Sequence, residues 1–447
     1  MKLTKRLSKL ILLVILVQTL FFPLFSSAST KEDFDSLNSS IQSEAVILIE
    51  SSTGKVIYSK NGEERNYPAS TTKILAAIIA IENCSLDEMA TVSEYAVTSI
   101  PSGYTNANIQ VGESLSIRDL LYALMLASAN EAAVIIGEHI SGSYEEFVNL
   151  MNEKAIEIGC TNSHFMNGNG IHDDNHYTTA HDLAKIAQYC MKNETFRQIV
   201  ATTSYTLPAT KLYPYNDRTF KNTNSLIIVN NNDVENNYYY PYAIGIKTGF
   251  TTPAGNCLVA AANNNGLEFI SVVLGSPDKN TRYVDAINMF NFAFNNYSFM
   301  KLQAKSNSIT TINIENGTND TKSLDLLINS DVNVLANLDN RNSTIEPKIN
   351  LKENLSAPIS KGDVVGTVTY DLDGLSYTAD LIASHDVEEK NNSLFTLFLK
   401  IVAVLVLILI VAGLLIKRKF KMDKIKYKRT RHLNNNNNNN RNRSLYK

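Results

Sequence analysis

Apolar positions follow two different spacings along the first part of the chain. Residues 45–49 and 55–59 are β-rich runs separated by a polar segment that ends in Gly54, a pattern typical of a hairpin. Residues 74–81 are almost wholly apolar and rich in alanine, which predicts a buried helix. The helical spacing recurs in four further segments: 117–127, 131–139, 144–158 and 180–192.

Strand patterns return further along the chain and are followed by one more helical segment. The strand-like runs are 243–247, 257–263 and 269–274, with turns that contain glycine between them, and the helical pattern covers 281–294. Strands at both ends of a segment with helices between them indicate a single α/β domain. We therefore expect one sheet that joins the two termini of a domain covering residues 29–298.

The pattern changes after about residue 297. Residues 299–390 lack helical periodicity and contain short alternating runs, such as 310–314 and 364–370, with turns rich in Asn, Gly and Asp. This spacing predicts a small all-β domain.

The beginning of the chain has the pattern of a secretory signal. Residues 1–28 have a basic start, an apolar run over 10–25 and the small residues Ser26-Ser27-Ala28, so we expect cleavage after Ala28. An uncleaved anchor is the alternative, and it fits less well because the small residues directly follow the apolar run.

Residues 394–416 have the length and composition of a membrane span. They are 23 residues with one charge, Lys400, and a helix rising about 1.5 Å per residue would cross a bilayer of about 30 Å. A helix lying on the membrane surface fits less well, because 402–416 is apolar all round. The tail 417–447 begins with a basic cluster, which predicts a cytoplasmic location, and its Asn434–Asn440 run predicts disorder. The chain is therefore expected to be a single-pass cell-membrane protein whose body is extracytoplasmic.

The formal net charge of −3 hides a strong regional imbalance. Residues 1–28 carry four basic and no acidic residues, and residues 394–447 carry thirteen basic residues and one acidic one. The body from 29 to 393 thus holds 24 of the 41 basic and 43 of the 44 acidic residues. Nucleic-acid binding needs Lys and Arg to neutralise phosphates, so this acidic body excludes nucleic acid as a partner.

Neither cysteine nor histidine spacing indicates a metal site. Cys84, Cys160, Cys190 and Cys257 are scattered; an exported protein could pair them in three ways, but we expect buried free thiols. A second group combines histidines and carboxylates in no known ligand spacing, and for it we expect a hydrogen-bonded polar loop; it comprises His164, His172, Asp173, Asp174, His176, His181 and Asp182. The sequence therefore predicts neither a metal nor another cofactor.

Ser70 and Lys73 have the spacing of a nucleophile and its base. They lie three residues apart at the start of a predicted helix and so share one face. A lysine can remove a serine proton when burial or a second cation lowers the lysine pKa. The free backbone N–H groups at a helix start can also stabilise an oxyanion.

The same S-x-x-K spacing occurs three more times, at Ser52/Lys55, Ser276/Lys279 and Ser298/Lys301. Ser70 differs from these by its preceding Pro68, by the apolar helix that follows it, and by two motifs further along the chain. These motifs are Ser128-Ala129-Asn130, between two helical segments, and Lys247-Thr248-Gly249, at the end of a strand pattern.

Each downstream motif offers groups that acyl transfer needs. Ser128 could relay a proton to a leaving amine, and Asn130 could hold a substrate amide. Lys247 and Thr248 could bind a carboxylate, while Gly249 would let a substrate backbone approach. Taken singly, Asn130 could equally be a helix N-cap and Lys247 a solvated strand end. The three motifs together make that explanation improbable.

The flanking residues resemble a known family. Pro68-Ala69-Ser70-Thr71-Thr72-Lys73, the segment from Leu126 to Ala133 and the segment from Gly245 to Thr251 are similar to the low-molecular-mass serine D-alanyl-D-alanine carboxypeptidases. The likeness covers about 40–295, and more weakly 355–385, which is similar to that family's C-terminal β domain. It implies a β-lactamase/transpeptidase-like fold: an antiparallel sheet with helices on both sides plus an all-helical cluster.

The resemblance implies a reaction for these residues. Ser70 would attack the carbonyl between two terminal D-alanines of a peptidoglycan pentapeptide, with Lys73 as base and Ser128 as proton relay. Lys247 and Thr248 would hold the terminal carboxylate, and the N–H groups of Ser70 and Phe250 would form the oxyanion hole. Water would release the acyl-enzyme, and β-lactams would be trapped as slowly hydrolysed acyl-enzymes.

Two segments depart from the family pattern. Members often have Asn-Pro-His-Gly where this chain has Asn167-Gly168-Asn169-Gly170, and Thr/Ser-Ala-Arg-Asp where it has Thr179-Ala180-His181-Asp182. These departures bear on deacylation more than on the reaction class.

Two other functions are weighed against the carboxypeptidase. A β-lactamase fits less well, because such enzymes are rarely followed by a β domain and a membrane span, and no extra deacylating glutamate stands out. An inactive wall-binding module is disfavoured by the intact Ser70, Lys73, Ser128 and Lys247.

Overall fold

A computed structural model describes residues 30–229, 238–337, 345–390 and 393–443. The predicted signal sequence, 1–28, lies outside these residues. The chain divides into two compact units, which we describe separately. Among the described residues, the first contains those up to Leu302 together with those in the segments Asn333–Glu346 and Tyr370–Tyr377, and the second contains the others.

A five-stranded antiparallel sheet forms the centre of the first unit. Its strands lie in the order β2-β1-β9-β8-β7. They are β1 (Ala45–Glu50), β2 (Val56–Lys60), β7 (Ala243–Thr251), β8 (Gly255–Asn264) and β9 (Leu267–Ser276). The predicted hairpin is confirmed as β1 and β2, and Ala45 of β1 pairs with Leu274 of β9. The sheet therefore joins the beginning and the end of this unit, as the sequence predicts.

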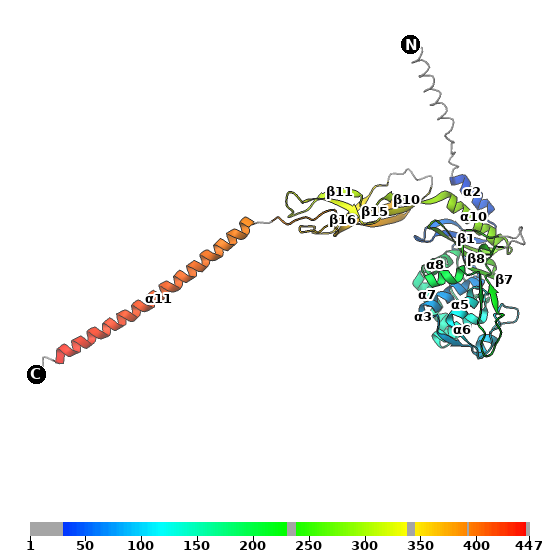
Figure 1. Cartoon of the computed structure of the whole chain (residues 1–447), viewed down its shortest axis with the longest axis horizontal. Coiled ribbons are helices and arrows are strands. Elements are labelled where there is room, and N and C mark those ends of the chain that lie inside the picture. The colour runs from blue at the N-terminus through cyan, green and yellow to red at the C-terminus, as the bar shows by residue number, and fades with distance from the viewer. Residues whose placement is uncertain (1–29, 230–237, 338–344, 391–392, 444–447) are drawn as a thin grey trace, which may run out of the picture. The chain divides into compact units, whose positions relative to one another are not determined.

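Side chains of β1 alternate between the two faces of the sheet, as the two-residue period of a strand requires. Val46 and Leu48 pack in one buried cluster with α2 (Thr30–Ser40) and α10 (Thr281–Asn296). Ile47 and Ile49 pack in the other cluster, which includes α8 (Ala180–Met191). Figure 1 shows α2 and α10 on one side of the sheet and α8 on the other. This arrangement confirms the predicted fold class.

The remaining helices of this unit form a cluster around α3. They are α3 (Lys73–Asn83), α4 (Glu94–Thr98), α5 (Ile117–Met125), α6 (Asn130–Ser141), α7 (Tyr144–Ile158) and α9 (Glu194–Ala201). The first eight residues of α3 are buried, which explains its uniformly apolar sequence. A capping box between Ser116 and Asp119 starts α5. The helices predicted by periodicity are confirmed to within two residues at each end.

The sequence pattern did not predict several short elements, because they contain too few residues to show a helical or strand period. They are the pair β3 (Met89–Thr91) and β4 (Ser114–Ser116), the pair β5 (Ser204–Thr206) and β6 (Thr219–Lys221), α4, and the 3-10 turns η1 (Ala69–Thr72) and η2 (Ser225–Ile227). The strand pair β10 (Tyr297–Gln303) and β13 (Val332–Asn337) completes the first unit.

The second unit is built on another five-stranded sheet, in the order β11-β12-β16-β15-β14. The strands are β11 (Ser308–Asn313), β12 (Ser323–Ile328), β14 (Lys348–Leu351), β15 (Val364–Leu372) and β16 (Leu375–Ala383). Leu324, Leu326 and Ile328 of β12 alternate with more exposed residues and are buried. The small all-β domain expected after the first domain is therefore present.

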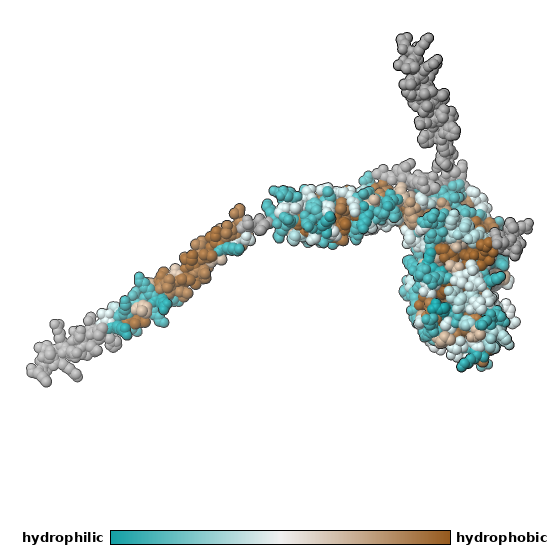
Figure 2. Space-filling model, viewed as in Figure 1, coloured by the Kyte–Doolittle hydropathy of each residue, from teal (hydrophilic) through white to brown (hydrophobic). Residues whose placement is uncertain are grey.

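A single helix, α11 (Ser393–Arg443), ends the described chain. Its stretch from Leu394 to Arg431 is long and apolar enough to cross a membrane. Figure 2 shows the hydrophobic surface covering the first part of this helix. The disorder predicted for residues 434–440 is wrong, because the helix continues through them, and extending a formed helix costs far less than starting one.

Candidate active site

Ser70 and Lys73 meet at the start of α3. The 3-10 turn η1 carries Ser70 and runs directly into the helix, whose first residue is Lys73. The Lys73 Nζ atom donates to Ser70 Oγ at 2.9 Å, to Asn130 Oδ1 at 2.8 Å and to the Asn169 carbonyl at 2.5 Å. The first two motifs predicted from the sequence are thereby brought together, and Asn169 is added to them.

The surroundings of Lys73 favour its neutral amine. The side chain is fully buried, and this burial lowers its pKa well below the ordinary lysine value. The positive charge of Lys247 lowers the pKa further, whereas the Glu131 carboxylate raises it. In its neutral form the amine keeps two N–H groups for Asn130 and Asn169, and its lone pair faces the Ser70 hydroxyl 2.9 Å away, where it can accept the hydroxyl proton.

Ser128 and Asn130 line the same cleft as Ser70. Ser128 has a left-handed backbone with φ of 60° and lines the cleft. The backbone N–H and the side-chain amide of Asn130 both donate to the Thr105 carbonyl, at 3.1 and 2.8 Å. Asn130 is the first residue of α6 and its side chain does not cap the helix, so the alternative N-cap interpretation is wrong.

Lys247 and Thr248 lie within β7, which runs four residues further than the sequence pattern indicated. The strand continues because β8 pairs with it as far as Thr251. Lys247 is only 1% exposed, so a solvated strand end is excluded. Burial, followed by the positive charge of Arg282, lowers the pKa of Lys247 to about 7. The Thr248 hydroxyl is hydrogen-bonded to Thr223 at 2.7 Å.

The edge of β7 lies against the nucleophile turn. A Cβ atom at Gly249 would be 3.1 Å from both the Pro68 carbonyl oxygen and the Ser70 nitrogen, so a larger residue would crowd Ser70. Phe250 follows on the rim of the cleft with a side chain that is 61% exposed.

Arg282 is a member of the site that the sequence interpretation missed. It is the second residue of α10, is 5% exposed and lines the cleft. Its guanidinium donates to the carbonyl oxygens of Gly249 and Cys257 at 3.1 and 3.2 Å. Only the packing of α10 against the sheet brings it beside Lys247, and no sequence motif marks it.

These residues border a cleft of about 820 Å³. Ser70, Ser128, Asn130, Thr248, Gly249 and Arg282 all line it. The cleft thus exposes the Ser70 hydroxyl and is lined by Arg282, while the buried amines of Lys73 and Lys247 lie next to the lining residues Ser70 and Thr248. This arrangement suits attack on a carbonyl that lies close to a carboxylate.

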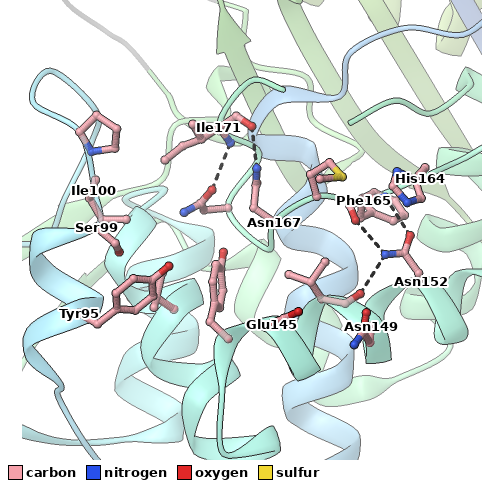
Figure 3. A pocket seen from close by; sticks show the side chains of 16 residues that line it. Tyr95, Ser99, Ile100, Glu145, Asn149, Asn152, His164, Phe165, Asn167 and Ile171 are labelled. Atoms are coloured by element: carbon pink, nitrogen blue, oxygen red, sulfur yellow. Dashed lines mark hydrogen bonds between the residues drawn. The ribbon is translucent and has the colours of Figure 1, made fainter. Parts of the chain in front are cut away.

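The loop that carries Asn169 is held in place by its own side chains. Asn167 accepts from the Gly170 N–H at 2.7 Å and donates to the Ile171 carbonyl at 2.8 Å, and the Tyr144 hydroxyl accepts from the Gly168 N–H. Figure 3 shows Asn167 and Ile171 beside a hollow of about 630 Å³, which Asn169 also lines. The loop therefore contacts both this hollow and Lys73.

The histidine-rich segment contacts several separate groups. His176 is buried, is hydrogen-bonded through Nε2 to Thr72 Oγ1 at 2.9 Å, and accepts from the Met166 N–H through Nδ1. His164, His172 and His181 contact the Asn175 carbonyl, Asp174 and Glu63, respectively. Burial lowers the pKa of His176 to about 3, so this histidine is neutral and braces the segment that holds Ser70.

All four cysteines are free thiols. Cys160, Cys190 and Cys257 are buried, as expected, whereas Cys84 is partly exposed and departs from the prediction. The difference arises because Cys84 lies just beyond the C-terminal end of α3, where the helix leaves the core.

Comparison with known proteins identifies related sequences over most of the chain. Residues 29–278 match the family described as D-alanyl-D-alanine carboxypeptidase, and residues 297–389 match the C-terminal domain of penicillin-binding protein 5. D-alanyl-D-alanine carboxypeptidase DacF of Bacillus subtilis is 31% identical, with 80% of this chain and 88% of the relative covered. DacA of Haemophilus influenzae is 27% identical, with 82% of this chain and 90% of the relative covered.

A solved structure supports the same relationship. Penicillin-binding protein 5 from Haemophilus influenzae is 28% identical and superposes with a TM-score of 0.61, covering 78% of this chain and 98% of its own. The DD-transpeptidase of Streptomyces K15 is 33% identical with a TM-score of 0.53, over 57% of this chain and 98% of its own.

Proposed function

The chain belongs to the D-alanyl-D-alanine carboxypeptidase family of penicillin-binding proteins, and we propose that its reaction proceeds through an acyl-enzyme on Ser70. The substrate is a peptidoglycan stem pentapeptide ending in D-Ala-D-Ala. The observation that carries the assignment of Ser70 is the 2.9 Å contact between its Oγ atom and the buried Lys73 amine.

Acylation starts with transfer of the Ser70 proton to Lys73. As the proton leaves, Oγ attacks the carbonyl carbon of the penultimate D-alanine. The developing oxyanion accepts hydrogen bonds from the backbone N–H groups of Ser70 and Phe250. The N–H of Ser70 lies in the turn against which Gly249 packs, so both donors border the same part of the cleft.

Departure of the terminal D-alanine requires a proton for its amine and a positively charged group that holds its carboxylate. The C–N bond breaks as Ser128 passes a proton, originally from Ser70 and held by Lys73, to the leaving amine. Lys247 in its protonated form, with Thr248, holds the carboxylate of the departing residue. Arg282 adds a second positive charge beside it. Asn130, held between Lys73 and the Thr105 carbonyl, positions the substrate amide.

Deacylation returns the enzyme to its first state. A water molecule gives a proton to Lys73 and attacks the ester carbonyl, and the released Ser70 oxygen takes a proton back. β-Lactams enter the same acylation step because their strained amide stands in for the D-Ala-D-Ala bond, and the resulting ester hydrolyses slowly.

The domain limits and the orientation of the chain are part of the proposal. Residues 1–28 are a cleaved signal, 29–298 the catalytic domain and 299–390 the β domain. The span 394–416 anchors the protein in the cell membrane with the catalytic domain outside and the tail 417–447 in the cytoplasm. The basic cluster after Ile416 supports this orientation.

The test uses the detergent-solubilised full chain with diacetyl-Lys-D-Ala-D-Ala and with labelled penicillin. We expect release of D-alanine and a long-lived penicillin adduct, and the loss of both in Ser70→Ala. Ser52→Ala is the matched control, because Ser52 has the same S-x-x-K spacing but lies in the turn between β1 and β2.

Each other outcome has a defined meaning. Rapid penicillin turnover without release of D-alanine would replace the carboxypeptidase with a β-lactamase. The absence of both adduct and release would contradict every enzymatic version. If Ser52→Ala and Ser70→Ala lost D-alanine release and the penicillin adduct equally, the assignment of Ser70 as the nucleophile would be wrong.

A further inference from the structure

Three side chains with different donor atoms converge at the C-terminal ends of α3 and α6. Cys84 follows the last residue of α3, Glu88 ends the next turn, and His139 lies in the last turn of α6. The Cys84 Sγ atom, a Glu88 carboxylate oxygen and a His139 ring nitrogen all lie within 4.8 Å of one another. Within the described residues, no other set of three or more His, Cys, Asp or Glu side chains converges in this way.

We propose that Cys84, Glu88 and His139 form a binding site for a divalent cation of the zinc class. Thiolate, imidazole and carboxylate are the donors that Zn²⁺ takes in proteins, at about 2.0–2.3 Å. Three protein ligands leave a fourth tetrahedral position for water. Calcium and magnesium are disfavoured, because they prefer oxygen ligands.

The donors are already positioned for such an ion. His139 Nε2 lies 2.9 Å from Glu88 Oε1, so a cation could take the place of the proton between them with a small adjustment. The other Glu88 oxygen accepts from the Ser85 N–H at 3.3 Å, which fixes the orientation of the carboxylate. The neighbouring Asp87 is paired with Arg118 at 2.9 Å and does not compete for the ion.

Electrostatics at this position also favours a cation. Helix C-termini carry partial negative charge, and both α3 and α6 end here. A divalent ion at this position would lie between the Cys84 sulfur and the Glu88 carboxylate and would stabilise both as anions at once. Cys84 and His139 are partly exposed, so an ion can reach them from solvent.

The site would join the far ends of the two helices that carry the catalytic motifs. Lys73 is the first residue of α3, Asn130 is the first residue of α6, and these two side chains are hydrogen-bonded at 2.8 Å. A bound ion would connect the opposite ends of the same helices. Because it would lie at the ends of α3 and α6 opposite Lys73 and Asn130, it would stabilise the helix pair without contacting the substrate.

The experiment measures metal binding to the full-length protein, kept reduced and freed of metal. We expect one equivalent of Zn²⁺ to bind in calorimetry and to raise the melting temperature. Co²⁺, a spectroscopic substitute, should give a thiolate-to-metal charge-transfer band. Cys84→Ser should abolish that band, and both Cys84→Ser and His139→Gln should weaken Zn²⁺ binding by about tenfold or more, because each removes one of three ligands.

Two controls keep the test specific. Cys160→Ala removes a buried thiol, and His164→Gln removes an exposed imidazole; both residues lie outside the proposed site. Both variants should bind Zn²⁺ as the wild type does. Labelling of Ser70 by penicillin should persist in Cys84→Ser and His139→Gln, which shows that these variants fold. The proposal is overturned if no thiolate band appears, or if Zn²⁺ binding is unchanged in Cys84→Ser or in His139→Gln.

Discussion

Lys73 and Lys247 are both buried in the same site but need opposite protonation states. In the proposed mechanism Lys73 is neutral when it accepts the Ser70 proton, and Lys247 is charged when it holds the carboxylate. Burial lowers both pKa values, and each lysine has a positive neighbour, Lys247 for Lys73 and Arg282 for Lys247. Activity thus requires a pH high enough to deprotonate Lys73 and low enough to keep Lys247 protonated.

This pairing predicts the alkaline limb of the pH profile. The kcat/KM of a free enzyme follows the pKa values of its essential groups, so kcat/KM should fall as the pH rises through about 7, where Lys247 loses its proton. Arg282→Gln removes a charge that lowers this pKa, so we expect lower kcat/KM and an alkaline limb shifted to higher pH. The measurement is the pH dependence of D-alanine release.

The matched control is Arg197→Gln, which also removes one partly buried arginine but disrupts an ion pair with Glu268 outside the cleft lining. Its alkaline limb should stay where the wild type has it. An unshifted limb in Arg282→Gln would contradict the electrostatic role assigned to Arg282.

His176 links the active-site turn to acid stability. Its pKa is about 3 in the folded protein and about 6.5 when unfolded, so the unfolded chain binds a proton that the native state rejects. The stability that His176 contributes is present above pH 6.5 and is lost as the pH falls toward 3. A shift of this size corresponds to roughly 5 kcal/mol at most.

We therefore expect His176→Gln to be less stable than the wild type at pH 7 but to lose stability less steeply between pH 6.5 and 4. Urea unfolding of both proteins across this range measures the difference. Exposed His164, replaced by Gln, serves as the control and should follow the wild type. If the free energy of unfolding changed with pH in parallel for the wild type and His176→Gln, the assignment of His176 as buried and neutral would be wrong.

At the scale of elements, the active site is the meeting point of one turn, two helix starts and one strand. Unusual backbone conformations occur at each junction. Ala69, Ser128 and Ile246 have positive φ values of 48°, 60° and 140°, and each lies in or beside one of the three motifs. Such conformations cost of order 1–3 kcal/mol each and persist where surrounding structure holds them.

Gly170 shows how closely these elements pack. Its φ is +80°, and a Cβ atom there would lie 1.9 Å from the Ala69 carbonyl oxygen, next to the nucleophile. Gly170→Ala should therefore displace Ser70, lower the rate of penicillin acylation by about a hundredfold, and lower the melting temperature. Acylation kinetics and thermal unfolding measure these effects.

Gly266→Ala separates the clash from the cost of the backbone conformation. Gly266 has a similar φ of +89°, but nothing lies within 4 Å of its Cβ position. The Gly266→Ala variant should lose about 1 kcal/mol of stability and keep the wild-type rate of penicillin acylation. Similar acylation rates in the two variants would show that close packing at Gly170 does not position Ser70.

At the scale of the whole molecule, the chain combines an acidic body with an apolar helix and a basic cluster. The apolar part of α11 has exposed side chains in the described structure, which suits contact with lipid. About twenty apolar residues suffice to span a bilayer.

We predict that a chain ending at residue 393 leaves the membrane fraction and keeps its D-alanine release in solution. The full chain should remain in the membrane after alkaline carbonate extraction, because α11 is held by apolar contacts rather than by charge. Immunoblots of the two fractions measure this. A full chain released by carbonate would exclude a spanning helix.

The sequence alone was sufficient for most of the long elements, though not for α2 and α9, and for the reaction class. Residues 144–158 show a helical period because one face of the helix packs in the core, whereas residues 74–81 are apolar throughout because almost the whole segment is buried. The three motifs can be recognised in the sequence because the members of each motif lie within a few residues of one another. The pairs are Ser70/Lys73, Ser128/Asn130 and Lys247/Thr248. Their chemistry could therefore be read before their geometry.

Only the tertiary structure decided which distant groups share a site. Asn169, Arg282 and the pair Cys84 and His139 lie on segments whose meeting depends on helix and strand packing, and packing leaves no local signature. The full extent of β7 depends on its pairing with β8, and the lowered pKa of Lys73 depends on burial supplied by the whole domain. Local periodicity records which residues are buried, whereas neighbours distant in sequence are fixed only when the chain folds.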